Sequence, residues 1–236
     1  MNKKTKRRIS LVVGILLLLV SLVLFILPIY GEHVLKEHSR HLSQQIASDV
    51  SADTLQANLN NPTSFDFSQV QSISVTSTLS MNRNTKVNYD QMIGQIVIPS
   101  VNINLTMFNG TNNENLLAGA ATMKPNQVMG QGNFTLASHI TRSKDVLFTN
   151  LRSIQKGAVV RITDKKTIYE YTIYETKTVS AYDVYLIEDA EATKHGKPIL
   201  SLMSCSDIDN LDNRFFAVGE LTNSYPYTAQ AMEKSN

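Results

Sequence analysis

The longest apolar run in the chain lies near its N-terminus, where residues 9–29 are hydrophobic except at four positions. An α-helix rises about 1.5 Å per residue and needs roughly 20 residues to cross a bilayer, so this run is long enough for a membrane span. A cleaved signal peptide has a shorter apolar core of about 7–15 residues and a small-residue cleavage site. The flank after the run lacks such a site. We therefore predict an uncleaved signal anchor over residues 9–30.

Positive charge is distributed unequally around this run. Residues 1–8 carry five Lys and Arg side chains, and the next cation after the run is Lys36. By the positive-inside rule, this basic tail lies in the cytoplasm and the chain after the anchor lies outside. The pattern predicts a single-pass protein of the cell membrane with an extracellular domain.

A segment of different character follows the predicted anchor. Residues 33–59 place aliphatic side chains at loosely helical spacing, and the sequence Asn-Asn-Pro-Thr at residues 60–63 stops the pattern. Residues 64–89 are rich in Ser, Thr, Asn and Gln, which is typical of a linker. We assign residues 31–90 to an extracellular juxtamembrane helix and linker.

The pattern changes to that of β-strands at residue 92. Residues 94–98 form an apolar run closed by Pro99, and residues 101–107 alternate apolar and polar side chains before an Asn-Gly turn. Further strand patterns lie at residues 133–138, 158–162, 167–179, 199–204 and 215–221. This succession predicts a mainly β domain with a closed or nearly closed architecture.

Only short helices fit between the predicted strands, near residues 113–118 and 146–151. The loops between the strands are therefore insertions on a β framework. We place the β-barrel domain at residues 91–222 and a polar C-terminal tail at residues 223–236.

Charge and cysteine content limit the possible partners of the extracellular part and the interactions that can stabilise it. The 22 Lys and Arg of the chain include the five at the N-terminus, so the exported part is slightly acidic against 20 Asp and Glu. This balance does not support a nucleic-acid partner. The chain has one cysteine, so no disulfide forms within it, and packing of the core must stabilise the domain.

Three side chains carry the candidate chemistry, and each lies at the end of a predicted strand. Cys205 follows the apolar strand 199–204, His139 follows the strand 133–138, and Arg214 begins the next strand after an acidic turn. A thiolate is a strong nucleophile, an imidazole serves as general acid and base, and a cation stabilises a developing oxyanion. Strand ends can meet side by side in a barrel, so these residues are candidates for one catalytic site.

Each of these residues also has a simpler explanation. A free cysteine is commonly a small apolar packing residue, and a single histidine is more often structural than catalytic. Arg214 is a surface charge in this interpretation, facing the acidic side chains Asp207, Asp209 and Asp212. The order of the three residues and their shared strand-end placement favour the catalytic interpretation.

Short motifs surround the three residues. Residues 201–205 read Ser-Leu-Met-Ser-Cys, residues 136–139 read Leu-Ala-Ser-His, and Arg214 opens a strand that ends in Gly-Glu-Leu at residues 219–221. These motifs resemble those of the class A sortases of Gram-positive bacteria, whose cysteine signature is Thr-Leu-x-Thr-Cys. Residues 119–130 look like the streptococcal and lactobacillal branch. The resemblance runs from about residue 92 to residue 221 and implies a closed sortase-type β-barrel of about eight strands, preceded by one transmembrane helix.

The resemblance implies a cysteine transpeptidase that cuts a Leu-Pro-x-Thr-Gly sorting signal between Thr and Gly. Cys205 attacks the threonyl carbonyl to form a thioester, Arg214 stabilises the oxyanion or orients the signal, and His139 protonates the departing amine. A peptidoglycan precursor amine, on lipid II or a wall bridge, then receives the protein, and hydrolysis of the thioester is a side reaction. The implied partners are surface proteins that carry the signal, the acceptor, and the membrane through the N-terminal helix.

The resemblance also implies which residues line the signal groove. The predicted substrate-binding residues are Ser138, Ser204, Val101, Leu105, Ala118, Ala121, Val184, Ile187 and Ile199. The loop of residues 180–198 is polar enough to move and close over the signal.

Two departures from the family bear on substrate and cofactor. Ser201 and Ser204 replace threonines of the signature, which keeps each hydroxyl and removes a methyl group. Some family members bind calcium through acidic residues before the histidine strand, but residues 118–141 contain no Asp or Glu. We therefore predict no calcium requirement, no cofactor and no metal site, and we interpret the histidines at 33, 38 and 41 as a solvated helix face.

Two other functions stay open on the sequence. An L,D-transpeptidase also uses a histidine and a cysteine on wall peptides, but its signature places glycine before the thiol and arginine two residues after it, unlike residues 204–207 here. The other alternative is a membrane-anchored β-fold binding module with an inert buried thiol. Activity that depends on Cys205 distinguishes the sortase from this module.

Overall fold

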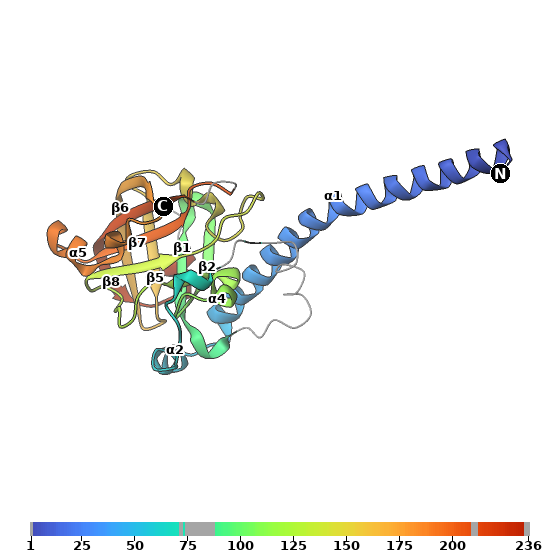
Figure 1. Ribbon diagram of the computed structural model, residues 1–236. Helices are drawn as coiled ribbons and strands as arrows, with labels where there is room; N and C mark the ends of the chain where they lie inside the picture. Colours follow the sequence, from blue (N-terminus) through green and yellow to red (C-terminus); the bar gives the residue numbers. More distant parts are fainter. Residues whose placement is uncertain (1, 71–72, 74–87, 209–211, 234–236) are drawn as a thin grey trace.

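The computed structural model describes residues 2–70, 73, 88–208 and 212–233. Its N-terminal helix α1 spans Lys3–Ser48 without a break and passes through Pro28. The first part of α1 extends away from the molecule and its last turns lie against the barrel (Figure 1). The predicted anchor and juxtamembrane helix are therefore one helix. Leu35, Leu42 and Ile46 are buried at helical spacing, which continues the helix into the domain.

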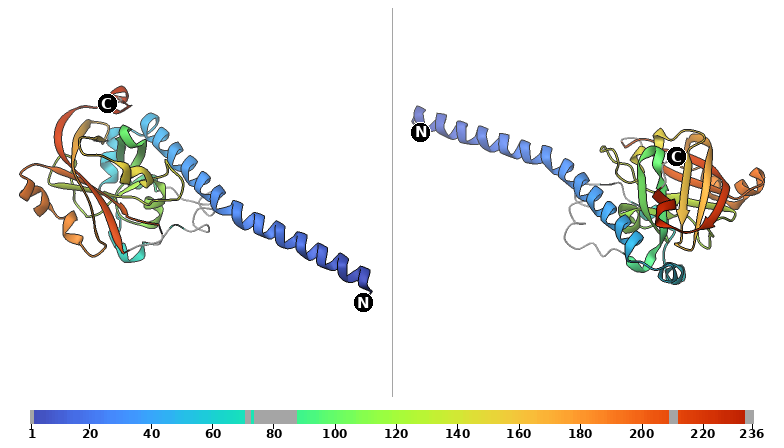
Figure 2. Two further views of the ribbon diagram at one scale, coloured as in Figure 1. Left: turned by 90° about the horizontal axis from the view of Figure 1, so that it is seen from above. Right: turned by 180° about the vertical axis from the view of Figure 1, so that it is seen from behind.

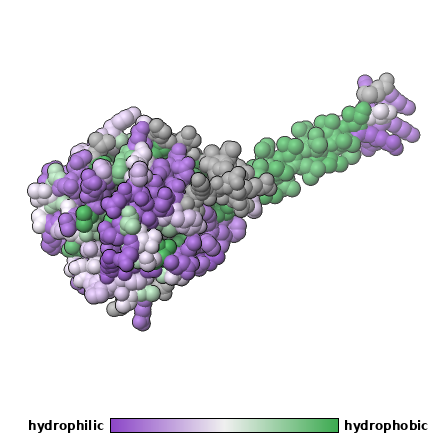
Figure 3. All heavy atoms as spheres, turned by 90° about the horizontal axis from the view of Figure 1, so that it is seen from below, coloured by the Kyte–Doolittle hydropathy of each residue, from purple (hydrophilic) through white to green (hydrophobic). Residues whose placement is uncertain are grey.

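The exposed part of α1 is apolar. Its large side chains between Ile9 and Ile29 are exposed, and they form a hydrophobic stretch between the charged N-terminal end and the polar domain (Figure 3). Within the part of the chain that the structure describes, α1 is the one helix long and apolar enough to cross a membrane. Exposed apolar side chains along such a length are stabilised by lipid and not by water.

The strands close into a barrel in the order β1-β2-β3-β4-β7-β8-β6-β5, which confirms the predicted architecture. Figure 2 shows the barrel from two further sides, with α1 leaving it on one side. The strands are β1 (Met92–Ile98), β2 (Ile103–Phe108), β3 (Ala120–Thr122), β4 (Asn133–Ala137), β5 (Val159–Thr163), β6 (Thr167–Ser180), β7 (Ile199–Cys205) and β8 (Asn213–Pro226).

Strand direction around β7 decides which chain ends meet. β4 runs parallel to β7 on one edge, and β8 runs antiparallel to β7 on the other. The C-terminal ends of β4 and β7 therefore lie beside the N-terminal end of β8. These are the strand ends at which the candidate catalytic residues lie in the sequence.

Side chains that alternate along the strands define the two faces of the barrel wall. The interior holds the main hydrophobic cluster, to which β4, β7 and β8 contribute Phe134, Leu136, Leu200, Leu202 and Ala217. The intervening residues of the same strands pack in smaller clusters on the outer face, among them Ile199, Met203, Phe216 and Val218. A residue's place in this alternation therefore tells on which face its side chain lies.

Short helices connect and cover the strands. The predicted helix at residues 113–118 is confirmed as α4, and η4 begins three residues later than the helix predicted near residues 146–151. The helices are α2 (Ala52–Asn58), η1 (Phe67–Gln69), η2 (Tyr89–Gln91), η3 (Pro99–Val101), α4 (Asn113–Ala118), η4 (Thr149–Ser153), η5 (Val184–Ile187), α5 (Asp189–His195) and α6 (Ala229–Glu233).

Two features of the C-terminal half differ from the sequence-based prediction. β8 continues to Pro226, beyond the predicted barrel end at residue 222, because it pairs with β6 as far as Thr167. The predicted polar tail at 223–236 then contains α6, whose Met232 is buried against Val97 and Ile168. Most of the predicted linker at 64–89 and Asp209 of the acidic turn lie outside the described residues.

Candidate active site

Strand register brings the segments of Cys205, His139 and Arg214 together. Cys205 is the last residue of β7 and pairs directly with Arg214 of β8. On the other edge of β7, Met203 pairs with the last residue of β4 in parallel register, so His139 lies two residues beyond this pair, as Cys205 does. Ser138 N donates to Met203 O at 3.2 Å, which extends the contact past the end of β4. The thiol therefore lies between the histidine segment and the arginine strand.

The thiol and the guanidinium share the outer face of the barrel. Leu202 of β7 and Ala217 of β8 fill the interior. Alternation then places Cys205, three residues from Leu202, and Arg214, three residues from Ala217, on the opposite, outer side of the wall. The connection between β6 and β7 also packs on this face, because its Leu186 lies in a cluster with outer-face residues of β7 and β8. The candidate site is therefore on the outer wall of the barrel, beside this connection.

Cys205 is a free thiol and half-buried. Burial raises the pKa of the thiol above its ordinary value of 9.0, and the positive charge of Arg214 acts in the opposite direction. Cys205 is therefore protonated at neutral pH in the resting structure. A base must take its proton before or during attack on a carbonyl.

His139 is buried just beyond β4. Burial lowers the pKa of its imidazole from 6.5 to about 4, so the ring is neutral at neutral pH. Its Nε2 atom is buried and has no hydrogen-bond partner. Its carbonyl oxygen accepts a hydrogen bond from Phe148 N at 3.0 Å. The ring nitrogen thus has no partner within the protein, while the backbone of His139 is held by the loop that follows it.

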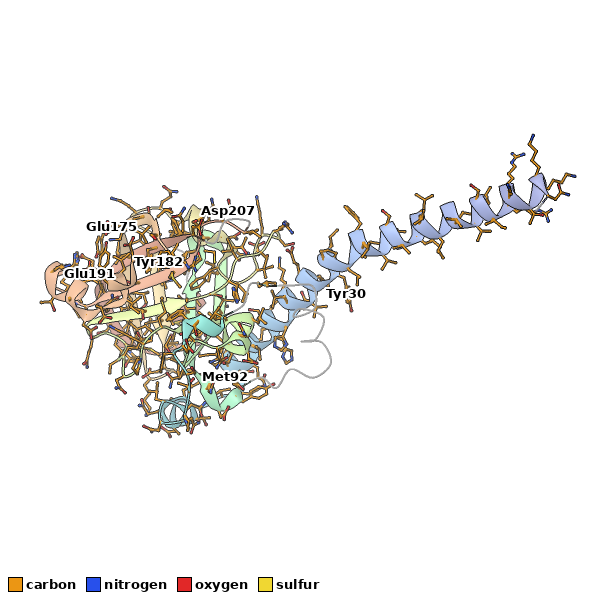
Figure 4. All side chains as sticks on the ribbon, viewed as in Figure 1. Tyr30, Met92, Glu175, Tyr182, Glu191 and Asp207 are labelled. Atoms are coloured by element: carbon orange, nitrogen blue, oxygen red, sulfur yellow. The ribbon has the colours of Figure 1, made fainter. Side chains whose placement is uncertain are left out.

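Arg214 supplies the positive charge of the site. Its guanidinium is partly buried, and Nη1 donates to the carbonyl oxygen of Asn213 at 3.2 Å. Figure 4 shows the side of the barrel on which this strand end lies: Asp207, two residues after Cys205, is on the side away from Met92. A cation directly across the strand pair from the thiol can stabilise negative charge that develops on a carbonyl attacked by sulfur.

The serines of the two motifs have structural environments of different kinds. Ser138 Oγ donates to Gly119 O at 2.6 Å, and Ser201 Oγ donates to Asn133 Oδ1 at 2.8 Å. Ser204 is buried with Leu202 on the interior side of β7, and its hydroxyl has no partner. Because Ser204 faces away from the thiol, its predicted contact with substrate stays a prediction that this geometry does not favour. Ser138 lies beside His139, but its hydroxyl is already used within the fold.

The predicted groove residues fall into separate parts of the domain. Ala121 and Ile187 pack together in one outer-face cluster, and Ile199 and Ile187 share a neighbouring one. Val184 lies in η5 of the same connection. The other three residues lie elsewhere: Val101 and Leu105 belong to the interior core, and Ala118 packs with Leu42 and Ile46 of α1.

This distribution separates two groups of groove predictions. Ala121 and Ile187 share their cluster with Met203, two residues before Cys205, so they lie near the candidate site. Val101, Leu105 and Ala118 pack in clusters that do not include Met203. Burial does not separate the groups, because Ala121 and Ile199 are at most 1% exposed and the other three are at most 8% exposed. The contact of Val101, Leu105 and Ala118 with a signal peptide stays a prediction.

An anchor that the sequence does not reveal holds the connection between β6 and β7. Asp189, the first residue of α5, accepts hydrogen bonds from Asn133 N at 2.8 Å and from Lys124 Nζ at 2.7 Å. The bond from Asn133 and the Lys124 ammonium hold the pKa of the Asp189 carboxyl below its usual value. Gly132, with φ +51°, leaves room for this carboxylate, since a Cβ atom there would approach it to 2.5 Å. The predicted mobile loop at 180–198 is therefore fixed at its middle.

Sequence signals for this part of the structure exist but are weak. Asp189 and Glu191 in the first turn of α5, Lys194 and His195 in its last turn, and Gly196 after it form a standard helix charge and stop pattern. The segment has only seven residues, so the pattern is easily read as a polar loop. The bond from Asp189 to β4 spans 56 residues of sequence and has no local signature.

Within the described residues, no group of three or more His, Cys, Asp or Glu side chains is arranged to hold a metal ion. Of the three histidines in α1, His38 is partly buried, and burial lowers the pKa of its imidazole. These observations describe the protein alone, so the absence of a cofactor or calcium requirement stays a prediction.

Comparison with known proteins identifies close resemblances over most of the chain. A family model described as the sortase domain matches residues 96–222. Sortase A of Listeria monocytogenes is 35% identical over 226 residues, which cover 94% of this chain and 96% of that protein. Sortase A of Streptococcus agalactiae is 42% identical over 199 residues, covering 82% of this chain and 76% of the relative.

The fold agrees with solved structures. The crystal structure of Listeria monocytogenes sortase A matches with a TM-score of 0.55 and 39% identity, over 61% of this chain and 94% of that chain. SrtF sortase of Corynebacterium diphtheriae, at 16% identity and a TM-score of 0.54, shares the fold over 61% of this chain and 93% of its own.

Proposed function

The chain belongs to the sortase family of transpeptidases, and we propose that it cleaves Leu-Pro-x-Thr-Gly sorting signals between Thr and Gly and transfers the cleaved protein to a peptidoglycan precursor amine. Because the chain belongs to this family, the two alternatives left open by the sequence, an L,D-transpeptidase and a non-catalytic binding module, are set aside. The proposal concerns the substrate, the acceptor and the residues that act on them.

One observation carries the proposal: Cys205 lies between the segment of His139 and the directly paired Arg214. A nucleophile, a group that exchanges protons and a fixed cation are the three components that acyl transfer through a thioester needs. The three residues lie at strand ends of one barrel wall, and this wall is a rigid support for such a site.

The first half of the proposed reaction forms the thioester. The Cys205 sulfur attacks the threonyl carbonyl while its proton passes to the neutral imidazole of His139. Arg214 stabilises the negative charge on the tetrahedral oxygen. The Thr–Gly bond then breaks, and the imidazolium gives its proton to the departing glycine amine. The lowered pKa of His139 makes the imidazolium a strong acid, which suits protonation of a poor leaving group.

The second half reverses these roles. The acceptor amine attacks the thioester carbonyl, His139 takes a proton from this amine, and the Cys205 thiolate leaves and recovers the proton. The products are a new amide and the free thiol. Water in place of the amine gives hydrolysis as a side reaction. The half-buried position of the thiol limits access of water to the thioester.

Signal recognition involves the outer face beside the connection between β6 and β7. Leu and Pro of a sorting signal offer mainly apolar surface, and the partly exposed Ile187 provides such surface next to Met203. We therefore retain Ile187 as the preferred groove residue, with Ala121 and Ile199 packed against it in the two outer-face clusters. The contact of Val184 with the signal stays a prediction. The client proteins in this proposal are surface proteins with a sorting signal, and no nucleic acid or metal cofactor takes part.

The exposed apolar part of α1 supports a place in the cell membrane, with the basic N-terminus in the cytoplasm and the barrel outside. This placement keeps the active site at the membrane surface, where a lipid-linked acceptor such as lipid II is found. Exposure of the barrel on intact cells to an added protease, with the N-terminal tail protected, tests the orientation.

The activity is tested with the whole chain in nanodiscs, because α1 buries side chains against the barrel. A Leu-Pro-x-Thr-Gly peptide and a glycine-based amine are added, and mass spectrometry detects the amide that joins the Thr carboxyl to the amine. The proposal predicts this product with the wild-type chain, with or without EDTA, and its loss in Cys205→Ala. Absence of the product from the folded wild-type chain, or an equal amount from Cys205→Ala, contradicts the proposal.

A further inference from the structure

The membrane helix contacts the loop that follows His139. The Glu32 carboxylate accepts hydrogen bonds from Arg142 N at 3.0 Å and from the Ser143 hydroxyl. One turn further along α1, Lys36 Nζ lies 3.6 Å from a carboxylate oxygen of Asp145. These contacts join residues that are more than 100 positions apart in sequence. They connect α1 to residues 140–148, which we call the histidine loop.

The histidine loop closes back on the residue that it follows. Phe148 N donates to His139 O at 3.0 Å, and Thr141 N donates to Thr149 Oγ1 at 2.9 Å. The Nε2 atom of the His139 ring has no partner. No hydrogen bond to Nε2 fixes the ring, so the backbone of the histidine loop and the packing around the buried imidazole determine where that nitrogen lies.

The loop has a backbone conformation that its surroundings must maintain. Asp145 and Leu147 have φ values of +60° and +49°, which non-glycine residues rarely adopt. Hydrogen bonds from Asn102 and Asn150 hold the pKa of the Asp145 carboxyl below its usual value, and Leu147 is buried in the core. Glu32 fixes the opposite limb of the loop, at residues 142 and 143. Without Glu32, that limb loses its charged acceptor.

α1 is fixed firmly enough to act as a support. Leu35, Leu42 and Ile46 are at most 1% exposed, and Ser43 Oγ donates to Asn104 O at 2.9 Å. At the other end of the docked part, Lys165 Nζ donates at 2.7–3.0 Å to the carbonyl oxygens of Ile46 and Ala47 in the last turn of α1 and of Val50 just after it. The helix that supports the histidine loop is therefore itself bound to β2 and to the turn between β5 and β6.

The contact lies immediately after the apolar span. Ile29 and Tyr30 are exposed, and Glu32 follows within the same turn of the helix. Figure 4 labels Tyr30 where α1 leaves the domain. The same helix that enters the membrane thus reaches the loop of the proposed acid and base within one turn of its exit.

We propose that Glu32 is a positioning residue for the transpeptidation reaction, holding the histidine loop so that His139 stays beside Cys205, with Lys36 in a supporting role. This inference rests on the proposed function, in which His139 transfers the proton. Lys36 contributes less, because its ion pair with Asp145 is more than a third exposed and screened by water. The membrane helix is then part of the catalytic apparatus as well as its anchor.

The test compares Glu32→Ala, Glu32→Gln and Glu37→Ala in the whole chain in nanodiscs. Glu37 is the matched control, since it lies on the same helix and its carboxylate pairs with the exposed Arg40 of α1. Small displacements of a catalytic group reduce turnover by up to about 10²-fold. Glu32→Ala is expected to lower kcat about 10-fold or more with little change in KM. Glu32→Gln, which retains one acceptor oxygen, recovers part of the rate, and Glu37→Ala matches the wild type.

Hydrogen–deuterium exchange supplies the readout that a general loss of stability does not give. Amides of residues 140–148 are expected to exchange faster in Glu32→Ala, while strands β7 and β8 keep their protection. Ser143→Ala removes one hydrogen-bond donor from the histidine loop. It is expected to lower kcat and to speed exchange of residues 140–148 by less than Glu32→Ala does, and it replaces Glu32→Ala as the test if that variant does not fold.

Three results overturn the inference: wild-type kcat in Glu32→Ala, an equal loss in Glu37→Ala, or a fall in kcat with unchanged exchange of the histidine loop. Failure of the proposed function itself is recognised separately. In that case the folded wild-type chain forms no amide, whatever the state of the loop.

Discussion

Cys205 and Arg214 are direct cross-strand partners, the last residue of β7 facing the second residue of β8. Antiparallel pairing without a bulge over the whole of β7 fixes this relation, so the backbones of the two residues stay opposite each other. The pairing of β7 with β8 therefore places a cationic residue opposite the candidate nucleophile.

Replacement of Arg214 with Ala is expected to lower kcat about 10²–10³-fold, which is the usual effect of removing one donor to an oxyanion. KM changes less, because the charge develops in the transition state and not in the bound signal. Steady-state transpeptidation by the whole chain measures both constants. Arg152→Ala, at an exposed position of η4, is the control and retains the wild-type rate. A near-normal rate in Arg214→Ala removes this residue from the mechanism.

The same pair predicts the titration of the thiol. Burial raises the pKa of Cys205 and the Arg214 cation opposes the rise, so Arg214→Met is expected to move the pKa further upward. The rate of alkylation by iodoacetamide against pH reports the thiolate directly. The midpoint lies above the ordinary range of a thiol in the wild type and at still higher pH in the variant. An unchanged midpoint indicates that the guanidinium does not act on the sulfur.

Burial of His139 predicts a loss of stability in acid. Its folded pKa of about 4 lies below the ordinary 6.5, so the unfolded chain binds more protons in this range. The free energy of unfolding therefore falls as the pH is lowered from 6.5 towards 4. At about 1.4 kcal/mol per pKa unit, the total is about 3 kcal/mol.

Urea unfolding of the whole chain in micelles at a series of pH values measures this component. His139→Gln cannot be protonated and is expected to lack it, while His33→Gln on the exposed side of α1 retains it. An equally steep loss in His139→Gln shows that other groups cause the acid sensitivity.

The Asp189 anchor predicts a change in substrate affinity. Asp189→Ala removes the acceptor for Asn133 N and Lys124 Nζ, which frees the connection that carries Ile187. We expect a higher KM for the signal peptide, a smaller change in kcat, and a stability loss of about 1–2 kcal/mol. Asp189→Asn keeps one acceptor oxygen, so its KM and stability are expected to lie between those of the wild type and of Asp189→Ala. Glu191→Ala, which loses an ion pair within α5, is the control. An unchanged KM in Asp189→Ala shows that the anchor does not shape the groove.

The strand framework and the strand ends that carry the candidate site were predictable from the sequence. Apolar runs ending at Ser138 and Ser204 identify β4 and β7, and the acidic turn before Arg214 marks the start of β8. β3 was not, because three residues, Ala120–Thr122, become a strand through their pairing with β2 and β4. Local propensity does not contain this information.

The groove residues were predicted from their positions in the related family, and position alone does not tell which face of the barrel wall a side chain occupies. Alternation in β7 was readable from the sequence: with Leu200 and Leu202 inside, Ser204 is also inside. The position of Ala118 beneath α1 was not readable, because an amphipathic helix shows that it has a buried face but not what it covers. For the same reason, the contact of Glu32 with the histidine loop required the structure.

The central claim, that the Cys205 sulfur becomes the acyl carrier, is tested most directly by trapping the intermediate. The whole chain in nanodiscs is incubated with a Leu-Pro-x-Thr-Gly peptide without an amine, quenched in acid, and mapped by mass spectrometry after proteolysis. We expect an adduct of the signal fragment ending in Thr on the peptide that contains Cys205, released by hydroxylamine and absent from Cys205→Ala. Formation of the amide product at the wild-type rate by Cys205→Ala, or an adduct on any other residue, would contradict the claim.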